Sequence, residues 1–295
     1  VRKAALEAIR AFLSPDFFDI FLQNLPLVDW LLFVQRADLL GIHNEIIDFV
    51  LSKEFTADLY QRVKKHDEKT RLIYFKYLFN KQVVDEEIVH LVLNDKNYLI
   101  RAALVKQVQH LATSKRKELV SKFLQDRAAK VRVAALYETR AFDHEFEPTV
   151  IELTSDESAS VRYLARFLLK DRSLNLADIY RQRLLEGNRI SGSILGLSEV
   201  GTKNDLPTFE TYIQVESVKV KLACLIGIHR IDRVLSKKYS LEFLSHPNSR
   251  LRTKSSELLS FYNDDEVLER ARSIFLHGGY EEKKTSLSLF NQIGG

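Results

Sequence analysis

The chain has 295 residues, of which 45% are hydrophobic and 28% are charged, so it carries enough apolar side chains to fold and is not a disordered segment. Ten glycines and five prolines are few for this length, which favours helices joined by short turns and argues against an all-β fold. The net charge of +4 permits an acidic partner without requiring nucleic acid.

The single cysteine, Cys224, excludes an intramolecular disulfide and a metal site built from several cysteines. It lies in an apolar run, and we interpret it as a buried small hydrophobic residue. The longest apolar window, residues 25–34, has about half the length that a membrane span needs and contains Asp29. A cytoplasmic location is therefore expected, with no membrane contact from this region itself.

Taken in chain order, residues 1–6 match the start of the second helix of a repeat, and residues 13–65 are helical but irregular. From residue 66 onward the chain repeats itself about every 30 residues. Six short segments align with a basic residue at their third position: Arg71, Arg101, Arg132, Arg162, Lys221 and Arg252. These residues are separated by 30, 31, 30, 59 and 31 positions, and residues 188–195 supply the unit missing from the doubled interval. We therefore predict regular repeats over 66–295, continuous with irregular helical repeats over 1–65.

Each regular unit contains two helical patterns. One unit has apolar stripes over residues 115–125 and 131–142, and the next has them over 148–153 and 161–169. Pro148 and Pro207 stand near the start of a first helix, where proline is tolerated. Neither helix pair can bury its apolar face alone, so the pairs are expected to stack on one another.

The pattern resembles the HEAT repeat, including the HEAT-like variety shared with phycobilisome lyases. The residues that carry the resemblance are an aspartate in the turn between the helices, then an aliphatic residue and arginine, then small residues. They occur as Asp95 with Ile100-Arg101, Asp126 with Val131-Arg132, and Asp156 with Val161-Arg162. The resemblance implies an all-α, right-handed superhelical solenoid of stacked antiparallel helix pairs, with first helices on the convex side and second helices lining a concave surface.

The recurring aspartates and arginines are interpreted as structural parts of the repeat. The aspartate can cap the second helix and accept hydrogen bonds from the arginine. An arginine of one repeat can also reach the aspartate of its neighbour, which would form a ladder along the array. The predicted ladder comprises Asp95, Arg101, Asp126, Arg132, Asp156 and Arg162.

The sequence shows no constellation that points to catalysis. The eight histidines are scattered, and no pair has the spacing of a helical zinc motif. No glycine group matches a phosphate-binding loop, and Gly192 and Gly196, four residues apart, are predicted to allow close helix packing. Ser191 and Ser193 lack a nucleophile-elbow pattern. We predict no catalytic residue, no metal site and no cofactor.

Two other functions share this architecture. Glycosylases of the DNA-alkylation-repeat type have similar stacked helices but need aromatic and acidic groups on a strongly basic concave surface. This chain has one tryptophan, Trp30, and a mild net charge, and its basic clusters are interpreted as solvated faces. A HEAT-like bilin lyase is the other alternative, and no chromophore-handling motif is evident.

A protein-binding scaffold needs only a stable extended surface, and this is the predicted function. Helical geometry turns one set of side chains in each second helix toward the concave side. The candidate partner-binding residues are Lys106, Tyr137, Arg140, Tyr163, Phe167 and Lys170. Exposed aromatics beside cations are typical interface anchors, and they favour an acidic or amphipathic peptide partner. For Phe167, the alternative is that it packs between neighbouring helices.

Neither end of the chain carries the polar cap expected of a terminal repeat. We hypothesise that the natural chain extends upstream, with room there for the missing first helix or for a membrane anchor.

Overall fold

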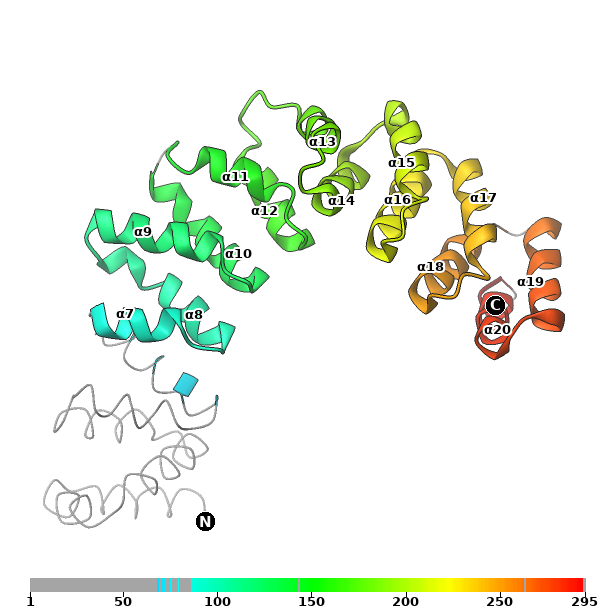
Figure 1. The fold of residues 1–295 in the computed structure, drawn as a ribbon, viewed down its shortest axis with the longest axis horizontal. Coiled ribbons are helices and arrows are strands. Elements are labelled where there is room, and N and C mark those ends of the chain that lie inside the picture. The colour runs from blue at the N-terminus through cyan, green and yellow to red at the C-terminus, as the bar shows by residue number, and fades with distance from the viewer. Residues whose placement is uncertain are drawn as a thin grey trace, which may run out of the picture. The chain divides into compact units, whose positions relative to one another are not determined.

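The computed structural model describes residues 86–142, 144–262 and 264–293, together with Glu68, Arg71, Leu72, Phe75 and Phe79. The described residues form helices and turns and include no strand, which confirms the all-α prediction for this part of the chain (Figure 1). The repeats predicted within 1–65, and Trp30, lie outside the described residues. The chain divides into two units, Val1–Ala141 and Phe142–Gly295.

In the N-terminal unit, the helices described from Glu86 onward form two hairpins. They are α7 (Glu86–Leu93), α8 (Tyr98–Val105), the 3-10 helix η1 (Val108–His110), α9 (Thr113–Leu124) and α10 (Ala129–Glu138), and the chain then leaves through η2 (Thr139–Phe142). Helix α7 packs on α8, and α9 packs on α10. The second helices α8 and α10 also pack on each other, so the two hairpins are stacked.

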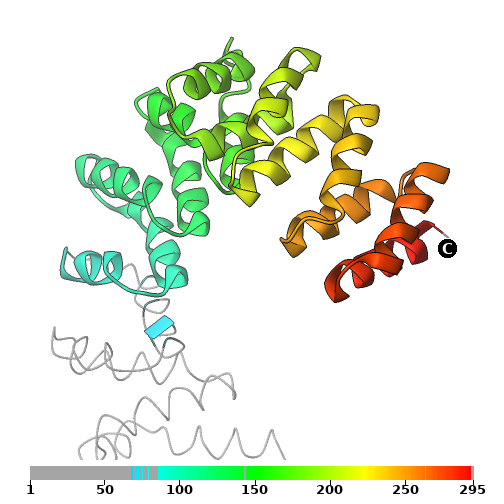
Figure 2. The same ribbon diagram turned by 45° about the vertical axis from the view of Figure 1, so that its right-hand side comes forward.

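The C-terminal unit continues the alternation of first and second helices. It contains α11 (Glu147–Leu153), α12 (Ala159–Leu168), α13 (Leu176–Leu185), α14 (Ile190–Val200), η3 (Lys203–Asp205), α15 (Leu206–Tyr212), α16 (Val218–Ile231), α17 (Arg233–Phe243), α18 (Ser249–Leu259), α19 (Asp265–His277) and α20 (Tyr280–Ile293). The odd-numbered helices are the first helices, and each packs on the even-numbered second helix that follows it. The second helices α14, α16, α18 and α20 also pack one on the next. Within this unit, the first and second helices form two separate rows (Figure 2).

Local sequence explains where several helices begin. Pro148 and Pro207 lie in the first turns of α11 and α15, as predicted, where the missing N–H breaks no helical hydrogen bond. Polar side chains accept from free backbone N–H groups at other starts, as Asp232 does from Leu235 and Asp264 from Val267. These caps set the short turns that keep successive helices antiparallel.

The core of the C-terminal unit depends on glycines that let aromatic side chains reach a second helix. A Cβ atom at Gly196 would lie 2.5 Å from the ring of Tyr180, and a Cβ at Gly227 would lie 2.8 Å from the ring of Phe209. Gly192 approaches the carbonyl oxygen of Ser155 so closely that its Cβ would lie 1.8 Å away. The prediction of close packing at Gly192 and Gly196 is confirmed.

Candidate protein-binding surface

In the N-terminal unit, an arginine of one helix bonds the turn aspartate of the hairpin that follows it. Arg71 Nε donates to Asp95 Oδ2 over 3.0 Å, and Arg101 Nε donates to Asp126 Oδ2 over 2.6 Å. A second bond, from Arg101 Nη2 to Asp126 Oδ1 at 2.8 Å, makes that pair bidentate. Burial favours protonation of Asp126, but the bonds from Arg101 and from the Ala128 N–H outweigh it and hold the pKa of Asp126 below its ordinary value.

The same arginines also bind backbone carbonyls of their own turns. Arg101 Nη1 donates to the carbonyl oxygen of Asp95 at 2.6 Å, and Arg132 Nη1 donates to that of Asp126 at 2.6 Å. Arg162 Nη1 donates to that of Asp156 at 2.8 Å. Each arginine therefore also stabilises its own turn, by donating to the aspartate carbonyl oxygen six residues before it.

The predicted capping role of the aspartates is wrong in one respect. Asp126 Oδ1 accepts from the N–H of Ala128, which is itself the N-cap residue of α10, and Asp156 Oδ1 accepts from the N–H of Ser158, the N-cap residue of α12. The aspartates lie two residues before the cap position, so their carboxylates close the turn and do not reach the first N–H groups of the helix.

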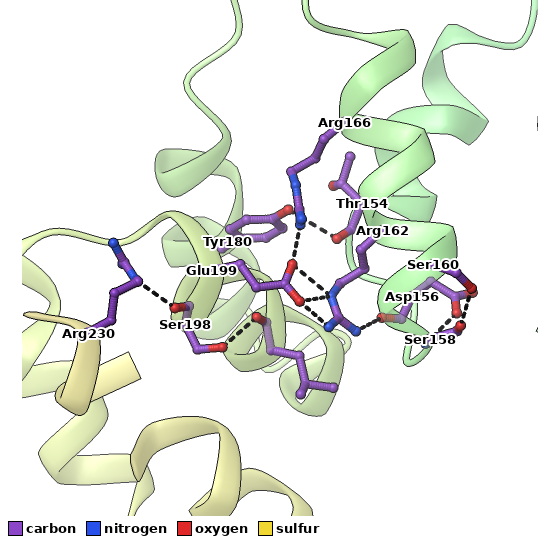
Figure 3. A network of polar contacts seen from close by, with 11 residues as sticks. Thr154, Asp156, Ser158, Ser160, Arg162, Arg166, Tyr180, Ser198, Glu199 and Arg230 are labelled. Carbon is purple, nitrogen blue, oxygen red and sulfur yellow. Dashed lines mark hydrogen bonds and ion pairs between the residues drawn. The ribbon is translucent and has the colours of Figure 1, made fainter. Parts of the chain in front are cut away.

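In the C-terminal unit, the carboxylate partner of Arg162 is Glu199, near the end of α14 (Figure 3). Arg162 Nε lies 3.2 Å from Glu199 Oε1, and Arg166 donates to the same carboxylate. Residues 186–189, the turn before α14, contain no aspartate, so the pair cannot form as it does at Asp126. Since Glu199 stands outside any turn, the repeat pattern gave no signal for it.

The six candidate partner-binding residues fall three in each unit. In the N-terminal unit, Lys106 directly follows α8 and is exposed, and Tyr137 on α10 is 52% exposed. The guanidinium carbon of Arg140 lies 5.4 Å from the centre of the Tyr137 ring. This distance is within the range of a cation–π interaction, so the tyrosine is held on the surface by a cation.

In the C-terminal unit, Tyr163 on α12 is 66% exposed and Phe167, one turn later, is 43% exposed. The Nζ atom of Lys170 lies 5.0 Å from the centre of the Phe167 ring. Phe167 is therefore not buried between helices, although about half of its surface is covered. Tyr163 and Phe167, four residues apart, share one face of α12, and Lys170 lies just beyond the end of that helix, over the Phe167 ring.

Ile226 on α16 is a further exposed residue of this kind. It follows Lys221 by five positions, as Phe167 follows Arg162, and it is 44% exposed. Applying the offset of Phe167 to the later repeats would have found it from the sequence. Leu195, at the same position of α14, is half-buried.

A second aromatic and cationic group lies where α16, α17 and α18 meet. Phe261 is 72% exposed, and both the His229 ring and the Arg233 guanidinium carbon lie 5.9 Å from its centre. His229 Nδ1 lies 2.9 Å from Ser236 Oγ. Burial, followed by the charges of Arg233 and Lys254, lowers the pKa of His229, so the imidazole is neutral at pH 7.

The described residues offer little for chemistry. Cys224 is fully buried, as predicted, and burial raises its pKa to about 12, so a thiolate does not form at neutral pH. No group of histidine, cysteine, aspartate or glutamate side chains in the described part of the chain could hold a metal ion. One shallow depression is lined by His144, Glu147, Pro148, Ile151 and Arg172. The carboxylate of Glu147 in this depression forms an ion pair with Arg172 Nε, 3.1 Å away.

None of the helices that the structure describes is both long and apolar enough to cross a membrane. No protein-family model matches this chain, and no curated protein matches it either.

Proposed function

We propose that the chain is a non-enzymatic protein-binding scaffold, built as a right-handed superhelical solenoid of HEAT type, whose second helices hold the partner. Stacking of α8 on α10, and of α14, α16, α18 and α20 in sequence, supports this architecture. The repeated arginine bonds from one turn to the next also support it, because contacts between neighbouring repeats are what stabilise such arrays.

The observation that carries the proposed function is the exposure of aromatic anchors on second helices. Tyr163 and Tyr137 are more than half exposed, and a cation lies over the ring of Tyr137 and over that of Phe167. Exposed apolar side chains that gather on one surface mark interaction sites, and aromatic and arginine side chains dominate the energy of protein interfaces.

The alternative, a nucleic-acid-binding protein of the DNA-alkylation-repeat type, would use the second-helix arginines on phosphates. Arg101, Arg162 and Arg252 are each 5% exposed or less, and their guanidiniums bind turn carbonyls. Guanidiniums that are this deeply buried as well as hydrogen-bonded are not available to a phosphate backbone. The same placement agrees with a scaffold, in which these arginines stabilise the array.

The proposed function is tested by affinity purification with the whole chain, followed by quantitative mass spectrometry. We expect proteins retained by the wild type to be lost from a Tyr163→Ser/Phe167→Ser variant. A Leu185→Ser variant, which removes an apolar side chain that is 89% exposed at the end of a first helix, should retain them.

A parallel titration with fluorescent DNA duplex and single-stranded RNA addresses the alternative. The scaffold would be contradicted if the wild type and both variants retained the same proteins. Tight nucleic-acid binding at physiological salt would also count against it.

A further inference from the structure

We propose that the partner is an acidic peptide segment with apolar side chains, docked on what we call the acidic-peptide face. This face consists of Phe167 and Ile226, which anchor the apolar side chains, and Lys170, Arg230 and Arg233, which meet the carboxylates. It lies within the C-terminal unit. The inference rests on the proposed scaffold function and names the chemistry of its partner.

The two anchors lie in one row of the repeat. Phe167 on α12, Leu195 on α14 and Ile226 on α16 each follow the aligned position of their unit by five residues, and the outer two are 43% and 44% exposed. Helix α14 packs on α16, and Arg162 of α12 bonds Glu199 of α14. With neighbouring helices roughly 8–10 Å apart, the two anchors are about 20 Å apart. An extended segment of about six residues spans that distance at roughly 3.3 Å per residue.

The three cations have no carboxylate partner among the described residues. Lys170 lies over the Phe167 ring, and Arg230 donates to the carbonyl oxygens of Ser198, at 3.0 Å from Nε, and Gly201. Arg233 contacts the His229 imidazole and the Phe261 ring. Neutral carbonyls, imidazole and aromatic rings leave the positive charge in place.

The one carboxylate at the matching end of α14 is already used. Glu199 accepts bonds from both Arg162 and Arg166, so it does not neutralise the cations of the acidic-peptide face. Cations that form no ion pair, placed around apolar anchors, are complementary to a partner with negative charge around apolar side chains. Ile226 has no π-system on which a base could stack, which favours a peptide over a single-stranded nucleic acid.

The test selects peptides from a displayed random library on the purified whole chain. We expect the selected peptides to be enriched in aspartate and glutamate and to carry at least two large apolar residues. Fluorescence anisotropy with the most enriched peptide then gives Kd for each variant. We expect Phe167→Ser, Ile226→Ser, Lys170→Glu and Arg233→Glu each to weaken binding about tenfold or more.

Two matched variants serve as controls. Lys238 lies 5.4 Å from the centre of the Tyr239 ring on the first helix α17, so Lys238→Glu reverses the charge of a cation–π pair outside the acidic-peptide face. Leu185→Ser removes an exposed apolar side chain elsewhere. Both should change Kd less than about twofold, because neither residue contacts the peptide. Thermal unfolding confirms that every variant is folded.

The outcomes separate this inference from the proposed function. Selected peptides without an excess of acidic residues, or equal effects of Lys170→Glu and Lys238→Glu, would overturn the acidic partner and leave the scaffold in place. Both the acidic partner and the scaffold would be overturned by two results together. The library would yield no peptide, and the wild type would retain no protein that the Tyr163→Ser/Phe167→Ser variant loses. Tight binding of a DNA duplex that Lys170→Glu abolishes would assign the cations to phosphate instead.

Discussion

At the scale of single residues, an arginine at the third position of a repeat can do two things at once. Arg101 binds the carboxylate of Asp126 ahead of it and the carbonyl oxygens of Asp95 and Lys96 behind it. Only a planar guanidinium with several N–H groups can serve both directions. Lys221, at the same position of α16, donates one hydrogen bond, to the carbonyl oxygen of Ile213 at 2.9 Å.

Replacing Arg101 tests this double role. Arg101→Leu leaves the Asp126 carboxylate and the turn carbonyls without their donor, and we expect a loss of about 2–4 kcal/mol in the free energy of unfolding. Arg101→Lys should lose roughly half as much. Urea unfolding followed by circular dichroism measures both. Arg250, an exposed arginine of α18, changed to leucine, is the control, and an unchanged midpoint in Arg101→Leu would contradict the proposed role.

The lowered pKa of Asp126 predicts how stability depends on pH. Because the folded pKa lies below the ordinary value of 3.8, the folded state favours the ionised carboxylate. Its contribution is fully present above that value and is lost as the pH falls through the folded pKa. We expect the difference in thermal midpoint between wild type and Asp126→Asn to be constant from pH 7 to about pH 5 and to shrink below about pH 4. A difference that grew on acidification would refute the sign.

At the scale of helices, the same contact between an aromatic ring and a glycine recurs between a first helix and the second helix that follows it. Tyr180 on α13 meets Gly196 on α14, and Phe209 on α15 meets Gly227 on α16. The two glycines are 31 positions apart, the period of the repeat. Tyr180 is held from the other end by a 3.0 Å hydrogen bond from its hydroxyl to the carbonyl oxygen of Thr154, so the ring cannot easily move away.

A methyl group at Gly196 should therefore be destabilising. Gly196→Ala places Cβ 2.5 Å from the Tyr180 ring, and we expect a loss of about 1–3 kcal/mol, measured by thermal unfolding. Adding Tyr180→Leu should recover part of the loss. At Gly187 nothing lies within 4 Å of an added Cβ and φ is +67°, so Gly187→Ala isolates the backbone cost of about 1 kcal/mol. Equal effects of the two alanines would argue against a steric cause.

How much of this was predictable depends on whether a contact is local in the sequence. The turn aspartates, the arginines and the order of helices follow from one period, and so does the exposure of Tyr163 on α12. The pairing of Tyr180 with Gly196 joins positions whose relation appears only when two helices pack. Glu199 was missed for the same reason, because nothing near it in the sequence marks it as a partner of Arg162.

At the scale of the whole molecule, a solenoid architecture predicts that a destabilising substitution affects only the repeat that carries it and the repeats next to it. Leu289 on α20 is fully buried with Leu259, Val267 and Ala271. Leu289→Ala should cost about 2–5 kcal/mol in the last hairpin. If repeats contact only their neighbours, hydrogen exchange followed by mass spectrometry will show lost protection in α19 and α20 and unchanged protection in α7 to α10. Loss of protection throughout would indicate one cooperative core and would contradict the solenoid.

Because Cys224 is completely buried, its thiol is a built-in probe of how readily the helices around it open. The chain has one thiol, and its sulfur has no accessible surface on α16. A thiol-specific reagent can react only while the surrounding helices are separated, so each labelled molecule has passed through at least one such opening. The labelling rate therefore reports breathing at the middle of the C-terminal unit, without any engineered probe.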